Sequence, residues 1–212
     1  INYTGDGTSG VYIYGAQLEA GSYATSYIPT YGTAATRVAE VCNGAGTSST
    51  FNSLEGVLFA NISALANDGT YRLISLVDAS DAGQTFLDIG YRDTDNTVRA
   101  RMEVSGVLSA GLQYTISDTT TASKIAFKYK ANDFALWING IEVDTDSSGG
   151  VFAAGILDEL TFSRSGVDFY GNTDQVLTFN TALTDLELET LTSYTSWTAM
   201  VNALNLNIIN NV

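Results

Sequence analysis

The chain has 212 residues, of which 45% are hydrophobic and 15% charged, a composition that suits one folded domain with an appendage and argues against disorder. Nine basic residues against 23 acidic ones give a net charge of −14, and the sequence shows no cluster of Lys or Arg, so nucleic acid is not expected as a partner. No apolar run is long enough to cross a bilayer, and membrane insertion is not expected.

Most of the chain consists of short segments separated by Gly, Asn, Asp and Ser. Residues 98–104 and 124–129 alternate apolar and polar side chains with a period of two, which predicts strands that bury one face. Further strands are expected at 56–62, 70–77, 85–92, 133–139, 140–144, 160–163 and 175–179. Many short strands at fairly regular spacing predict a mostly β fold, either a sandwich or a barrel.

The last part of the chain changes to helical patterns. Thr184 and Glu187 have the spacing of a capping box, which predicts a helix from about 185 to 194 that docks on the strands. A second apolar stretch follows at 200–209, and its Val201, Leu204 and Ile208 share helical spacing. We expect residues 198–212 to form either a packed tail or a surface for assembly with a partner subunit.

The residue types restrict the chemistry that one chain can perform. The sequence has no histidine and one cysteine, Cys42, which excludes a Ser-His-Asp triad, an internal disulfide and a thiolate zinc site. Only carboxylates remain for catalysis, and Glu142, Asp144 and Asp146 would share one face of a strand. They follow the turn signal Asn139-Gly140, so the polar outer edge of a hairpin is the simpler interpretation.

Residues 11–30, VYIYGAQLEAGSYATSYIPT, followed by Thr36-Arg37, resemble a segment that recurs in the tail proteins and other virion structural proteins of bacteriophages. In those proteins the segment closes a small β domain and leads into the next module. The resemblance implies that residues 1–45 are a linker or the remnant of a preceding β domain. It also implies that the protein belongs to a virion tail or fibre assembled in the bacterial cytoplasm.

Four segments are similar to laminin G-like domains of the concanavalin A-like group: 136–140, 168–171, 176–180 and 182–187. This resemblance implies a concanavalin A-like antiparallel β-sandwich over residues 46–197, with a short C-terminal helical segment. Catalytic members of the group carry the pattern Glu-x-Asp-x-x-Glu on one strand, and this sequence has no such run. The resemblance therefore favours binding over hydrolysis.

Aromatic side chains are the candidates for binding a sugar, because a ring can stack on the apolar face of a pyranose. If Leu136 and Ile138 face the core, Trp137 points the other way, and Asn139 beside it offers an amide. Tyr129 and Tyr91 are further candidates for glycan binding. The alternative is that both faces of this strand are covered and that the aromatic residues pack inside the domain.

Asp93, Asp95 and Asn96 form a loop with three oxygen-bearing side chains, which suits Ca²⁺. The alternative is a hairpin turn that uses Asp and Asn for their backbone tolerance. No cofactor is otherwise required.

The sequence predicts a non-enzymatic adhesion module of a phage virion that binds a host surface polysaccharide or glycan. The expected partners also include other virion proteins and two further copies of this chain in a homotrimer. One alternative is a structural or decoration module that joins virion parts. Another is a polysaccharide-degrading enzyme, which the missing histidine and the missing acid pattern disfavour.

Overall fold

The computed structural model describes residues 44–94 and 96–206, together with 4, 6–8, 10, 15–16, 18, 26–29 and 31–35 nearer the start of the chain. The chain divides into two units, Ile1–Glu40 and Val41–Val212, and the described helices and strands all belong to the second. In the described part, no helix is long and apolar enough to cross a membrane.

The second unit contains two five-stranded antiparallel sheets and a small hairpin. The central sheet has the order β12 (Gly171–Phe179), β1 (Glu55–Ala64), β6 (Ser123–Lys130), β7 (Phe134–Ile138) and β8 (Ile141–Asp146). The outer sheet has the order β5 (Val107–Thr115), β4 (Thr97–Val104), β3 (Phe86–Tyr91), β2 (Arg72–Val77) and β9 (Glu159–Thr161). The hairpin pairs β10 (Ser163–Arg164) with β11 (Val167–Asp168).

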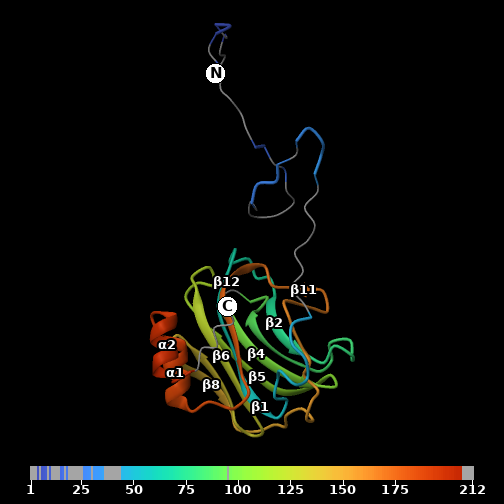
Figure 1. Cartoon of the computed structure of the whole chain (residues 1–212), viewed down its shortest axis with the longest axis vertical. Coiled ribbons are helices and arrows are strands. Elements are labelled where there is room, and N and C mark those ends of the chain that lie inside the picture. The colour runs from blue at the N-terminus through green and yellow to red at the C-terminus, as the bar shows by residue number, and fades with distance from the viewer. Residues whose placement is uncertain are drawn as a thin grey trace. The chain divides into compact units, whose positions relative to one another are not determined.

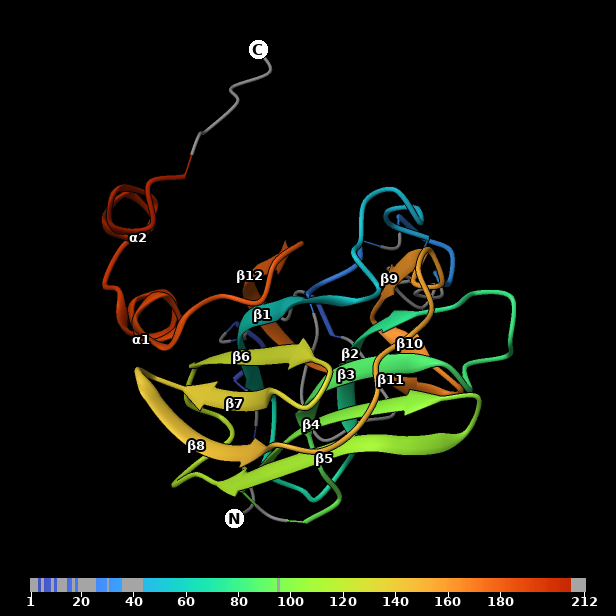
Figure 2. The ribbon, with the colours of Figure 1, turned by 90° about the horizontal axis from the view of Figure 1, so that it is seen from below.

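The helices α1 (Asp185–Ser193) and α2 (Trp197–Ala203) lie on one side of the central sheet, and the outer sheet lies on its other side (Figures 1 and 2). The described part of this unit is therefore three layers deep, in the order helices, central sheet and outer sheet. The prediction of a mostly β antiparallel sandwich with a short C-terminal helical segment is confirmed.

The main core lies between the two sheets, and alternate residues of each strand form it. Leu58, Phe127 and Leu136 come from the central sheet and meet Leu87 and Ala100 of the outer sheet. These positions agree with the period-two pattern, because side chains two residues apart on a strand point to the same face. The pattern therefore predicted correctly which residues of β4 and β6 face the core.

A second apolar cluster joins the helices to the central sheet. Val57, Phe59 and Ala126 on the strands are fully buried together with Leu188 and Leu191 of α1. The capping box predicted at the start of α1 is present: the Thr184 side chain accepts from the Glu187 N–H, and the Glu187 carboxylate accepts from the Thr184 N–H. The helix expected at 185–194 is confirmed as α1.

Two lysines of β6 fix α1 on the central sheet. The Lys124 Nζ donates to the carbonyl of Tyr194 just past the helix C-terminus, and its ammonium lies 4.7 Å from the centre of the Tyr194 ring. The Lys128 Nζ lies 2.7 Å from an oxygen of Asp133 and 3.8 Å from an oxygen of Asp185, at the first residue of the helix. The two ends of α1 are therefore each held by a cation on the same strand face.

The C-terminal apolar stretch begins earlier than predicted. Helix α2 covers Trp197–Ala203, and its Met200 and Val201 are buried in the cluster with α1. Of the three residues expected to share a helix face, Ile208 lies outside the described residues. The packed-tail alternative therefore describes α2, whereas an assembly role for 198–212 stays a prediction.

Candidate ligand-binding face

Trp137 does point away from the main core, as its place between Leu136 and Ile138 predicts, but the face that it reaches is covered. Its side chain is 7% exposed and packs in the cluster with Leu188 and Leu191 of α1. The helices leave the ring no free side on which a sugar could stack. This burial corrects the interpretation of Trp137 as a stacking residue and agrees with the alternative that both faces of β7 are covered.

Tyr91 and Tyr129 also lie inside the domain. Both rings are buried in the main core, and their hydroxyls donate to the carbonyl oxygens of Ile62, at 2.9 Å, and of Asn52, at 2.6 Å. Burial raises the pKa of both hydroxyls above the usual value. Their role is internal packing, which corrects their assignment as glycan-binding residues.

Asn139 is exposed but serves the turn between β7 and β8. Its φ is 50° and that of Gly140 is 87°, values that a two-residue hairpin turn of the primed type requires. Its side-chain oxygen accepts from the Lys124 N–H at 2.9 Å. The predicted hairpin is thus present, while its neighbour Trp137 offers no surface with which Asn139 could form a sugar site.

The predicted calcium loop lies partly outside the described residues, so calcium binding there stays a prediction. Asp95 lies outside the described residues, Asp93 pairs with Arg92 at 3.6 Å, and Asn96 has a φ of 57°. The side-chain oxygen of Asn96 accepts from the Asn67 amide at 2.9 Å. No group of three or more His, Cys, Asp or Glu that could hold a metal occurs among the described residues. For Asp93 and Asn96, this agrees with the alternative of a turn.

The acids of β8 do not form one catalytic face. A β-bulge shifts the register, so that Glu142 pairs with Trp137 and Asp144 with Leu136, two residues that point to opposite faces of β7. Asp144 accepts the N–H of Gln113 at 3.0 Å on the edge of β5. The period-two expectation for these carboxylates fails because the bulge inserts an extra residue.

The outward side of β4 and β5 is the exposed sheet surface that we call the open face. It consists of the exposed Leu108, Gly111 and Gln113, the half-buried Arg99 and Arg101, and the buried Glu103. The last three alternate on β4 with Val98, Ala100 and Met102, which are in the main core, so they point away from the central sheet. The hairpin β10–β11 lies against β2, and the open face therefore occupies the β4–β5 side of the outer sheet.

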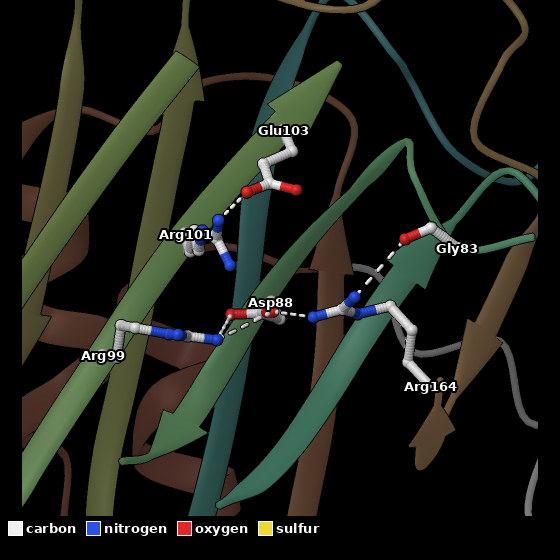
Figure 3. Close-up of polar contacts among 6 residues, drawn as sticks. All are labelled: Gly83, Asp88, Arg99, Arg101, Glu103 and Arg164. Carbon is white, nitrogen blue, oxygen red and sulfur yellow. Dashed lines mark hydrogen bonds and ion pairs between the residues drawn. The ribbon is translucent and has the colours of Figure 1, made fainter. Parts of the chain in front are cut away.

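A buried carboxylate at the border of the open face binds two of its neighbouring arginines. Asp88 on β3 is 0% exposed, and its oxygens lie 3.3 Å from Nη2 of Arg99 and 2.8 Å from Nη2 of Arg164 (Figure 3). Arg164 also donates to the carbonyl of Gly83, and its guanidinium carbon lies 3.5 Å from the centre of the Phe86 ring. Burial raises the pKa of Asp88, although the charges of Arg99 and Arg164 act in the opposite direction.

Arg101 stands next to this cluster but does not bond to Asp88. Its guanidinium pairs with the carboxylate of Glu103 two residues along the strand (Figure 3). Its side chain is 33% exposed, more than that of Arg99 or Arg164. Of the three guanidinium groups of Arg99, Arg101 and Arg164, that of Arg101 is therefore the one that a molecule in solution reaches most readily.

Two glycines shape the surroundings of these arginines. Gly90 pairs with Arg99, and a Cβ there would lie 1.9 Å from the carbonyl oxygen of Arg72, so this position needs glycine. Gly111 pairs with Arg101, and a Cβ there would meet only the Leu108 side chain, at 3.6 Å. The surface beside Arg101 is therefore bare backbone with room above it.

The cluster could not be found by reading the sequence linearly. In the sequence, Arg99 and Arg101 form only the polar side of the alternating segment 98–104, and Arg164 lies 65 residues from Arg99 along the chain. The expectation that basic residues are unclustered holds for the linear sequence and fails in three dimensions. The sequence carries no signal specific to this cluster, because Lys128 and Lys130 of β6 occupy alternate positions just as Arg99 and Arg101 do.

No protein-family model and no curated protein sequence matches this chain, whereas solved structures do. One is the CBM40 of the Ruminococcus gnavus IT-sialidase bound to α2,3-sialyllactose, at 14% identity and a TM-score of 0.55, covering 73% of this chain and 96% of that one. Another is a SAP-like pentraxin of Limulus polyphemus, which is heptameric, at 14% identity and a TM-score of 0.54, covering 73% and 76%.

A structure of NanB with Optactamide matches at 16% identity and a TM-score of 0.54, covering 70% of this chain. This chain spans only 27% of that longer protein. Similarity at these identities shows the fold, and it confirms the predicted concanavalin A-like sandwich.

Proposed function

We propose that this domain is a non-enzymatic carbohydrate-binding module whose ligand lies on the open face. The observation that carries the proposal is the contrast between the outward faces of the two sheets. Helices α1 and α2 cover the central sheet, whereas the open face presents guanidinium and amide groups around the bare backbone of Gly111. Polar groups that converge beside an accessible surface are what a saccharide requires. The CBM40 structure with sialyllactose supports the proposal by sharing the fold.

A steric block tests the site without disturbing the core. Gly111→Phe adds a ring where a Cβ has only an ordinary contact with Leu108, so the domain should fold and glycan binding should be lost. The matched control is Leu186→Phe on α1, which adds bulk at a side chain that is 74% exposed on the covered side. Binding of the unmodified chain and both variants is measured on a glycan array. Equal binding by all three would remove the open face from the proposal.

Hydrolysis has less support than binding. The sequence has no histidine, and the acids of β8 lie on different faces or serve the edge of β5. Reducing-sugar release from a polysaccharide that the chain binds is the direct test, and sustained release would replace the binding module with an enzyme.

We extend the proposal to adhesion of a bacteriophage tail or fibre to a host surface glycan. This part rests on the resemblance of residues 11–30 to virion proteins.

In a homotrimer the contacts would have to come from surfaces other than Met200 and Val201, which are buried within the chain. Light scattering of the chain at micromolar concentration measures the assembly, and a monomer would count against a homotrimer. Binding to no glycan would favour the structural or decoration module.

A further inference from the structure

We propose that the saccharide bound on the open face carries an anionic group, which the guanidinium groups of Arg101 and Arg99 recognise. This inference rests on the proposed carbohydrate-binding function and adds the chemical class of the ligand. It depends on the placement of charge, on the hydrogen-bonding capacity of the cluster and on the apolar surface beside it.

Positive charge is concentrated on one side of the outer sheet. The chain carries a net charge of −14, yet four of its nine basic residues, Arg92, Arg99, Arg101 and Arg164, lie on or beside one side of the outer sheet. Asp88 is compensated by Arg99 and Arg164. Arg101 is not needed for that purpose, because its partner is Glu103. The three arginines of Figure 3 face two carboxylates, which leaves one positive charge in excess.

The positive charges of Arg99 and Arg164 also repel that of Arg101. Burial lowers the pKa of Arg101, and the positive charges of Arg99 and Arg164 lower it further, against the effect of Asp88. A bound anion would relieve this repulsion because it adds a negative charge beside the guanidinium groups. The site is thus better suited to a negatively charged group than to a neutral hydroxyl.

Donors outnumber acceptors in the cluster. The Nε atoms of Arg99 and Arg164 are buried and have no hydrogen-bond partner among the described residues. Each guanidinium has five N–H donors and no acceptor, so a carboxylate, sulfate or phosphate supplies what the cluster lacks. Because the buried Nε atoms themselves are out of reach, the terminal nitrogens of Arg99 and Arg101 would make the contact.

The surface beside Arg101 favours a sugar over a small inorganic anion. Leu108 is 58% exposed and lies next to Gly111, so apolar surface and bare backbone adjoin the guanidinium. The C–H face of a sugar ring can lie on such a surface while its acidic substituent reaches Arg101. A free phosphate or sulfate would interact only with the positive charge of the guanidinium groups and would not cover the apolar surface.

The probes for the test are polygalacturonate, hyaluronan and polysialic acid, each paired with its carboxyl-reduced neutral form. Dextran sulfate and poly(glycerol phosphate) complete the set, so that carboxylate, sulfate and phosphate groups are each tested separately. We expect the full chain to bind an acidic polymer about tenfold or more tightly than its neutral counterpart. Binding should weaken as the salt concentration rises from about 50 mM to about 300 mM.

Arg101→Gln is the decisive variant, because Arg101 does not contact buried Asp88 and a Gln amide at this position can still donate to Glu103. Its affinity for the acidic polymer should fall about tenfold or more, in protein that circular dichroism shows to be folded. Lys130→Gln is the matched control: it removes the same charge from the central sheet, where Lys130 pairs with Glu55. This control should bind as the parent does.

Each other outcome overturns the inference in a distinguishable way. Equal binding to an acidic polymer and its neutral form would retain the carbohydrate-binding function and remove the anionic ligand. Equal losses in Arg101→Gln and Lys130→Gln would show that only net charge matters. Binding to no saccharide, acidic or neutral, would overturn the proposed function and the inference together.

Discussion

The same alternation of side chains along a strand sets the outward residues of β7 and of β4, but those of β7 are buried and those of β4 are partly exposed. On each strand, residues next to core positions point away from the main core, Trp137 in β7 and Arg99 with Arg101 in β4. Helices α1 and α2 bury the first face, and the second is partly exposed. Alternation therefore assigns residues to faces, whereas a distant part of the chain decides which face meets solvent.

The largest effect should come from the covered face. Trp137→Ala removes a large side chain between β7 and the helices and should cost about 3 to 5 kcal/mol of unfolding free energy. Urea unfolding followed by circular dichroism measures this loss. Trp197→Ala is the control, because Trp197 is 41% exposed on α2 and its loss should cost less than about 1 kcal/mol. Similar values for both variants would contradict the placement of Trp137 under the helices.

An intermediate effect is expected beside the open face. Asp88 and Arg164 form a buried ion pair, so the variants Asp88→Asn and Arg164→Met should be non-additive, with a coupling energy of about 0.5 to 3 kcal/mol. A double-mutant cycle of unfolding free energies measures it. The comparison pair, Glu55 and Lys130, is more exposed and should couple by no more than about 1 kcal/mol. Coupling no larger for the first pair would show that Arg164 does not hold Asp88.

The smallest effect concerns the capping box that starts α1. Hydrogen bonds from the Thr184 side chain and N–H lower the pKa of Glu187. A carboxyl with a lowered folded-state pKa contributes stability above its unfolded pKa and loses it as the pH falls through its folded pKa. Glu187→Gln should therefore destabilise the domain by less than about 1 kcal/mol at neutral pH and by less still in acid. Unfolding free energies across pH measure the difference, and a gap that widened in acid would contradict it.

Local patterns predicted most of the strands and α1, because alternation and capping are properties of neighbouring residues, but they did not predict β5, β10 or β11. They did not predict the cover over Trp137, which depends on contact with Leu188 and Leu191 some fifty residues later. One local signal was available: β7 reads Phe-Ala-Leu-Trp-Ile without a polar position, as is typical of strands that are buried on both faces. The cluster around Asp88 had no such signal, since its arginines come from distant segments.

The bulge in β8 and the carboxylate of Asp144 affect how the sheet edges of neighbouring copies can pair at high local concentration. Strand β5 ends the outer sheet and β8 ends the central one, and Asp144 occupies the Gln113 N–H that a strand from another molecule would seek. At the opposite end, Ala45 pairs with Leu160 of β9 through two backbone hydrogen bonds. Free sheet edges template aggregation, so these contacts reduce the pairing that the β5 and β9 edges offer to neighbouring copies.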